Sequence, residues 1–94
     1  MKQLALALTA VILLFGAGAA SAQEALAKSA GCLNCHAIDA KKVGPSFKEI
    51  ASKNKGKADA EARLTAKLTS GSGHPAVKAK PEEVSALVKF VLAQ

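Results

Sequence analysis

Two cysteines and a histidine stand close together in this 94-residue chain, at Cys32, Cys35 and His36. Side chains three residues apart fall on one side of a single helical turn. Both sulfurs can therefore add to the two vinyl groups on one edge of a haem, and the adjacent histidine can offer a nitrogen to the iron. This Cys-x-x-Cys-His spacing is the attachment motif of c-type haem, so one covalent haem c with its iron is the expected cofactor.

Three other kinds of chemistry use a pair of cysteines at this spacing. A redox-active thiol pair needs a βαβ setting, and the sequence has no strand pattern. A structural zinc site needs four ligands, but only the three residues of the motif and His74 are available, and two of them are adjacent. A disulfide between Cys32 and Cys35 would constrain very little of the chain. The adjacent histidine favours covalent haem attachment over these alternatives.

The N-terminal segment has the pattern of an export signal. Lys2 gives it a positive start, Leu4–Phe15 is an apolar run, and Ala20-Ser21-Ala22 is a small-residue cleavage pattern. We expect cleavage after Ala22, which divides the chain into a signal peptide of residues 1–22 and one domain of residues 23–94. An uncleaved membrane anchor is the alternative, because the apolar segment is close to the length that spans a bilayer. No second apolar run follows, so we expect a periplasmic mature chain that does not insert into the membrane.

The expected mature domain is too small to be stable on its own core alone, since domains of this size bury only about 60% of their unfolded surface. A covalent cofactor would supply the missing apolar surface. The helical periodicity predicts an all-α fold. The expected helices are Glu24–Ala30, Ser46 to about Lys53, Asp59–Leu68 and a last helix with Pro81 in its first turn. The apolar stripe of the last helix consists of Val84, Leu87, Val88, Val91 and Leu92.

Residues 24–94 resemble the small bacterial monohaem class I cytochromes c. The resemblance includes the Cys-x-x-Cys-His motif and Lys42–Phe47, which is similar to the family's K-x-V-G-P-[AS]-[YF] segment. It implies about four short helices wrapped around one covalent haem. It also implies that the Pro45 carbonyl accepts a hydrogen bond from His36, the proximal ligand, which would fix the ring and raise its basicity. Phe90 takes the place of the aromatic residue in the family's last helix.

The distal ligand is the point at which the sequence departs from that family. Class I cytochromes c normally use a methionine, but the only methionine here is Met1, in the segment expected to be removed. Counting back along the last helix places the family's Met-Pro step on His74-Pro75. Neutral imidazole binds iron well, so the resemblance makes His74 the predicted second ligand. A lysine ligand from Lys78 or Lys80, and an open or labile site, are the alternatives.

The function expected from this resemblance is that of a periplasmic one-electron carrier rather than an enzyme. The alternative is a five-coordinate or labile-ligand haem protein that binds or senses NO or CO. A peroxidase is disfavoured because the chain has no distal acid–base cluster beyond His74. The chain could also be the small cytochrome subunit of a larger oxidoreductase.

The basic charge suggests partners that are redox proteins with acidic docking surfaces, which lysines near the haem edge would steer. Generic solubility is the competing explanation of the same charge. Nucleic-acid binding is disfavoured because stacking aromatic residues and binding motifs are missing. The lysines expected at the rim of the site are Lys41, Lys42, Lys78 and Lys80.

Overall fold

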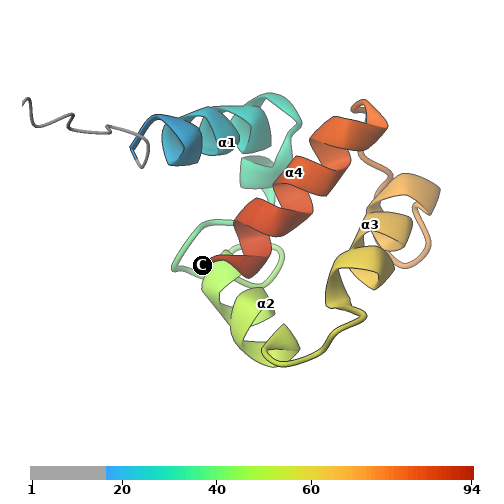
Figure 1. The fold of residues 1–94 in the computed structure, drawn as a ribbon. Coiled ribbons are helices and arrows are strands. Elements are labelled where there is room, and N and C mark those ends of the chain that lie inside the picture. The colour runs from blue at the N-terminus through green and yellow to red at the C-terminus, as the bar shows by residue number, and fades with distance from the viewer. Residues whose placement is uncertain (1–16) are drawn as a thin grey trace, which may run out of the picture.

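The computed structural model describes residues 17–94, and the predicted all-α fold is confirmed in them: they form helices and turns and no strand. Figure 1 shows the order of the elements along the chain. The charged start and the apolar run of the expected signal peptide lie outside the described residues. The elements are α1 (Ala17–Ser29), the 3₁₀ turn η1 (Cys32–Asn34), α2 (Phe47–Asn54), α3 (Ala60–Ser70) and α4 (Pro81–Leu92).

The predicted starts of α2 and α4 agree with the structure because both depend on local capping chemistry. The Ser46 hydroxyl accepts a hydrogen bond from the Glu49 backbone N–H at 3.1 Å, which satisfies one of the free donors in the first turn of α2. Pro81 is the first residue of α4, and the Lys80 backbone N–H donates to the Glu83 carboxylate at 3.0 Å.

The first helix differs from the prediction at its N-terminal end. It was expected over Glu24–Ala30, but α1 begins at Ala17 and ends at Ser29. The additional first turns are rich in alanine, which has the highest intrinsic helix propensity. In the full-length chain, α1 therefore includes the expected cleavage position after Ala22.

Helix α4 lies at the centre of the fold and packs against α1, α2 and α3 (Figure 1). The main buried cluster joins three of these helices through Ala27 of α1, Phe47 of α2, and Leu87 and Phe90 of α4. The two phenylalanine rings meet edge to face, with centroids 6.1 Å apart and planes at 81°. This contact places α2 against α4 and fixes the position of the chain segment that precedes α2.

The predicted aromatic of the last helix, Phe90, is buried in this cluster, with 5% of its surface exposed. An exposed ion pair between Lys89 and Glu61, at 3.8 Å, also joins α4 to α3, but such surface pairs contribute little to stability. None of the helices within residues 17–94 has both the length and the apolar character that crossing a bilayer requires.

Candidate cofactor site

The cysteine motif lies on the short turn between α1 and α2. Gly31 precedes it with a φ of 85°, a left-handed conformation that glycine adopts without steric cost. The backbone then closes one helical turn, in which the His36 N–H donates to the Cys32 carbonyl at 3.0 Å. This turn brings Cys32, Cys35 and His36 into the lining of one cavity.

No disulfide joins Cys32 and Cys35. Cys32 is half-buried and Cys35 is exposed. Burial raises the pKa of the Cys32 thiol, although a backbone hydrogen bond partly opposes this shift. Across the described part of the chain, no cluster of three or more cysteine, histidine or acidic side chains is arranged to hold a metal ion.

His36 is held by the segment that precedes α2. The His36 Nδ1 and the Pro45 carbonyl oxygen are 2.6 Å apart, which is the hydrogen bond that the family resemblance implied. The Gly44 N–H donates to the Cys35 carbonyl at 2.8 Å and keeps this segment on the cysteine turn. A Cβ atom at Gly44 would lie only 2.5 Å from the His36 Cε1 atom. The backbone can approach the imidazole this closely only because residue 44 has no side chain.

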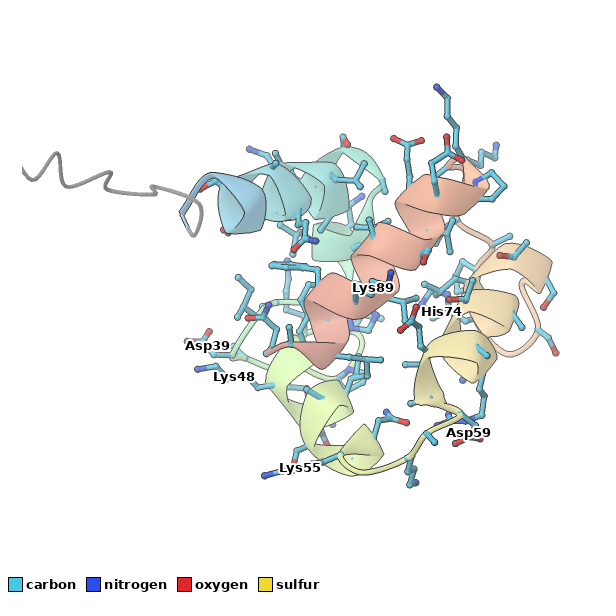
Figure 2. The ribbon with its side chains drawn as sticks, in the orientation of Figure 1. Asp39, Lys48, Lys55, Asp59, His74 and Lys89 are labelled. Carbon is cyan, nitrogen blue, oxygen red and sulfur yellow. The ribbon has the colours of Figure 1, made fainter. Side chains whose placement is uncertain are left out.

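His74 lies in the loop between α3 and α4 and lines the same cavity as His36 (Figure 2). The loop turns away from α3 through Gly71 and Gly73, whose φ angles are 73° and 72°. A backbone hydrogen bond of 2.8 Å from the Val77 N–H to the Leu68 carbonyl returns it to α3. The loop thus holds His74 near the mouth of the cavity without any regular secondary structure of its own.

The two imidazoles lie almost parallel. Their ring centroids are 6.0 Å apart, and their planes make an angle of 9°. The His74 Nδ1 is 2.7 Å from the carbonyl oxygen of Pro75, so it is engaged in the same way as the His36 Nδ1 with Pro45. Each histidine that donates from Nδ1 keeps its other ring nitrogen, Nε2, as a lone-pair donor able to bind a metal.

The cavity between these histidines has a volume of about 510 Å³. Side chains of α2, α3 and α4, of the cysteine turn and of the loops beside them line it, and most of them are apolar. Such a lining favours a large apolar ligand over water or a small polar metabolite. The apolar side chains that line it are Ala30, Phe47, Ile50, Leu64, Leu68, Ala76, Val77, Leu87, Val88 and Val91, together with Pro45 and Pro75.

Three cationic side chains, and no acidic ones, also line the cavity: Lys53, Arg63 and Lys67. The Arg63 guanidinium donates to the Asn54 side-chain oxygen at 2.5 Å and pairs with Asp59 at 3.5 Å. Sequence reasoning missed these residues, because nothing in their local pattern distinguishes them from surface charges. The only available signal was their spacing, since Arg63 and Lys67 are one helical turn apart beside the apolar residues Leu64 and Leu68.

The lysines predicted at the rim differ in their placement. Lys42 is attached to the cysteine turn, because its ammonium group donates to the Leu33 carbonyl at 3.0 Å. Its neighbour Val43 is 83% exposed, which is unusual for a large apolar side chain. None of the four lysines predicted at the rim, Lys41, Lys42, Lys78 and Lys80, is among the residues that line the cavity.

Comparison with known proteins agrees with these features. A family model described as cytochrome c matches residues 19–94. Cytochrome c-551 of Pseudomonas aeruginosa is 40% identical in an alignment that covers 97% of this chain and 93% of that protein. Cytochrome c-552 of Nitrosomonas europaea is 35% identical, with 98% and 97% covered. The crystal structure of the class 1 cytochrome MtoD from Sideroxydans lithotrophicus superimposes with a TM-score of 0.72 and 39% identity, covering 78% of this chain and 92% of MtoD.

Proposed function

This chain belongs to the cytochrome c family, and on that premise we propose that it is a one-electron carrier whose haem iron is bound by two histidines. Proteins of this family carry covalent haem c, and the motif cysteines Cys32 and Cys35 are the attachment points that we assign. His36 is the proximal ligand and His74 the distal one. The haem supplies the ferric–ferrous couple, and the protein supplies attachment, orientation and burial.

The assignment of His74 rests on the distance and orientation between the two imidazole rings. Each metal–imidazole bond is about 2 Å long and each ring centroid lies roughly 1 Å beyond its nitrogen, so two rings on one metal have centroids about 6 Å apart. The rings of His36 and His74 have that separation, at 6.0 Å. Both Nδ1 atoms are engaged by carbonyl oxygens, which leaves both Nε2 atoms for the iron.

The lysine and open-site alternatives receive less support from the geometry. Lys78 and Lys80 lie outside the cavity lining, whereas His74 lies within it. An iron left open for NO or CO would require His74 to be away from the iron, which its position beside His36 opposes. A peroxidase needs a distal acid–base group that is free of the iron, whereas we assign His74 to the iron. An electron carrier is therefore the function that the site supports best.

The redox potential tests this proposal. Replacing the usual thioether by a second imidazole removes a ligand that raises the potential. We therefore expect a potential lower than those of the similar cytochromes c-551 and c-552, measured by optical redox titration under the same conditions for all three proteins. A potential as high as that of a methionine-ligated class I cytochrome c would contradict the two-histidine assignment.

The cationic side chains of the cavity are suited to the two carboxylates of a haem. Arg63 is held in place by Asn54 and Asp59, and Lys67 lies one turn further along α3. A cation beside the haem disfavours the ferric state, in which the iron carries one more positive charge. We expect Arg63→Gln to lower the redox potential more than Lys57→Gln, which removes the same charge outside the cavity. Equal shifts in the two variants, titrated at the same salt concentration, would exclude a direct role for Arg63.

The close approach of Gly44 to His36 gives a second structural test. In Gly44→Ala, the new methyl group would meet the imidazole at 2.5 Å, so the ring must move from its position under the Pro45 carbonyl. We expect less haem-loaded protein and an altered ferric absorption spectrum. Gly56→Ala is the control, because φ there is 76° but no atom lies within 4 Å of the added Cβ. That variant should lose about 1 kcal/mol of stability and keep its spectrum.

Export to the periplasm is the location that we propose, with cleavage after Ala22. The apolar run and the small-residue cleavage pattern support it. Cleavage would remove the first turns of α1 and leave Ala27, which contributes to the buried cluster, in the mature chain. An N-terminal sequence of the secreted protein that begins at a residue other than Gln23 would correct this boundary.

Electron exchange requires a partner to come close to the haem edge. The loop formed by Lys41, Lys42 and Val43 is attached to the cysteine turn and presents one exposed apolar side chain beside two cations. This combination suits a redox partner with an apolar centre and an acidic rim. The same kind of contact would serve if the chain is the small subunit of a larger oxidoreductase.

A further inference from the structure

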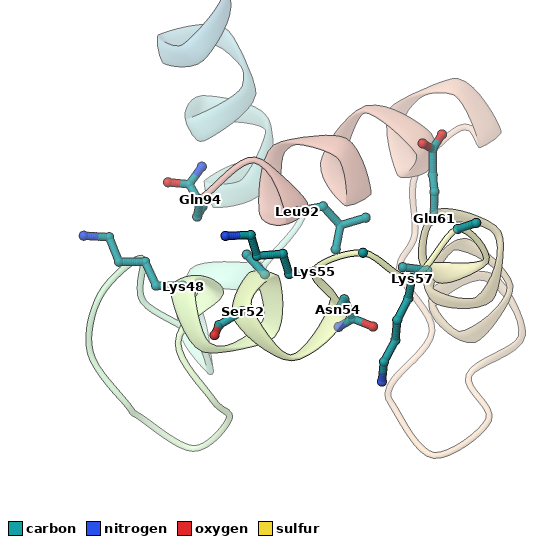
Figure 3. Close-up of a pocket in the computed structure, with 12 residues that line it drawn as sticks. Lys48, Ser52, Asn54, Lys55, Lys57, Glu61, Leu92 and Gln94 are labelled. Carbon is teal, nitrogen blue, oxygen red and sulfur yellow. The ribbon is translucent and has the colours of Figure 1, made fainter.

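A second hollow, of about 650 Å³, lies beside the cofactor cavity, and Asn54 lines both of them (Figure 3). It is bounded by the outer side of α2, the loop between α2 and α3, and the C-terminal end of α4. Lys48 and Lys55 lie on the side of α2 that faces away from His74 (Figure 2). A molecule bound in this hollow, which we call the basic groove, would not cover the cysteine turn. Its lining residues are Lys48, Ala51, Ser52, Asn54, Lys55, Gly56, Lys57, Ala58, Ala60, Glu61, Leu92 and Gln94.

The lining of the basic groove combines small and aliphatic side chains with cations. The cations are the lysines Lys48, Lys55 and Lys57. None of these three lysines is in an ion pair with a residue of the range 17–94. The one acidic side chain of the lining, Glu61, already faces Lys89 at 3.8 Å. The groove therefore keeps a positive charge that the described residues leave uncompensated.

Backbone hydrogen bonds hold the walls of the groove in place. The Lys55 N–H donates to the Ser52 carbonyl at 3.3 Å, and the Lys57 N–H donates to the Asn54 carbonyl at 3.1 Å. Gly56, with a φ of 76°, makes the tight turn between them and leaves open space above it. In Figure 3 the side chains of Lys48 and Lys55 extend toward the same side. A pre-formed backbone lowers the entropic cost of binding a ligand.

We propose that the basic groove binds an acidic, extended segment of a redox partner and tethers this chain to it. Carboxylates of the segment would pair with Lys48, Lys55 and Lys57, and its small side chains would contact the alanines of the lining. Contacts for electron transfer are usually small and short-lived. A tether keeps the two proteins together, so it raises the effective concentration at which the electron-transfer contact forms. The purpose of the tether rests on the proposed carrier function, but binding of an acidic segment can be measured without it.

The experiment is an NMR titration of the haem-loaded, reduced protein with a synthetic hexaglutamate peptide at low salt. We expect shifts of the backbone amides of residues 51–60 and 92–94, and loss of these shifts at high salt. The variant Lys55→Glu/Lys57→Glu should bind the peptide about tenfold more weakly. Its matched control, Lys41→Glu/Lys42→Glu, changes the charge by the same amount at the cysteine turn and should bind the peptide nearly as well as the wild type.

Three results would overturn the proposal. These are no binding by the wild type at low salt, shifts centred on residues 41–44 instead of the groove, and equal weakening in both double variants. Absorption and circular dichroism spectra of each variant establish that the haem and the fold are intact before the titration. The redox potential and the ligand spectra are measured separately, so failure of the groove and failure of the carrier function are distinguishable.

Discussion

His74→Ala is expected to convert an iron that does not react with CO into one that binds CO rapidly and completely after reduction. If His36 and His74 both bind the iron, as we propose, an exogenous ligand must displace His74 in the wild type. The alanine side chain cannot coordinate iron, and Lys78 and Lys80 lie outside the cavity lining. We expect the absorption spectra of both oxidation states to change as well, because the ligand field at the iron is weaker.

Lys78→Ala is the control for this result and should leave the spectra and the CO behaviour of the wild type unchanged. Addition of CO to the reduced proteins, followed optically, measures both variants. If His74→Ala keeps the ferric and ferrous spectra of the wild type, His74 is not the ligand. If Lys78→Ala binds CO instead, the ligand is the lysine.

A chain that cannot attach haem is expected to be largely unfolded. In the double variant Cys32→Ala/Cys35→Ala, the cavity of about 510 Å³ beside α2, α3 and α4 would have to remain open or collapse. Empty apolar volume destabilises a protein by about 24 cal/mol per Å³ in core-truncation experiments, and a domain this small has little stability to lose. Only seven apolar residues of the described chain are buried without the cofactor.

Far-ultraviolet circular dichroism of this double variant measures the loss of helix. The single variant Cys35→Ala is the comparison, since one thioether at Cys32 can still retain the haem and most of the helix signal. A double variant with near-native ellipticity and a cooperative thermal transition would show that the polypeptide folds without its cofactor, contrary to our expectation.

The parts of the fold that depend on local chemistry were predictable from the sequence. The Ser46 cap and Pro81 placed the starts of α2 and α4, because both act within one turn of their own position. The Cys-x-x-Cys-His spacing likewise predicts a haem-attachment turn, and its three residues do line one cavity. The N-terminal end of α1 was not predicted, because the alanine-rich residues there fit both a cleavage site and a helix.

Tertiary contacts determined the features that sequence reasoning missed. Arg63 lines the cavity and donates to Asn54 of α2. The two residues meet because α2 and α3 both pack against α4. The spacing of His36 and His74 likewise depends on the whole loop between α3 and α4. Local periodicity carries no information about such pairs. The resemblance to a known family indicated the pair of His36 and His74, but not the pair of Arg63 and Asn54.

The central claim is that two nearly parallel imidazoles, His36 and His74, bind the iron from opposite sides. Electron paramagnetic resonance of the frozen, oxidised protein tests it most directly, because the signal depends on the identity and relative orientation of the axial ligands. With ring planes at 9°, we predict a rhombic low-spin ferric spectrum typical of two aligned imidazoles. A high-spin signal would mean that the distal position lacks a strong ligand and would contradict the claim.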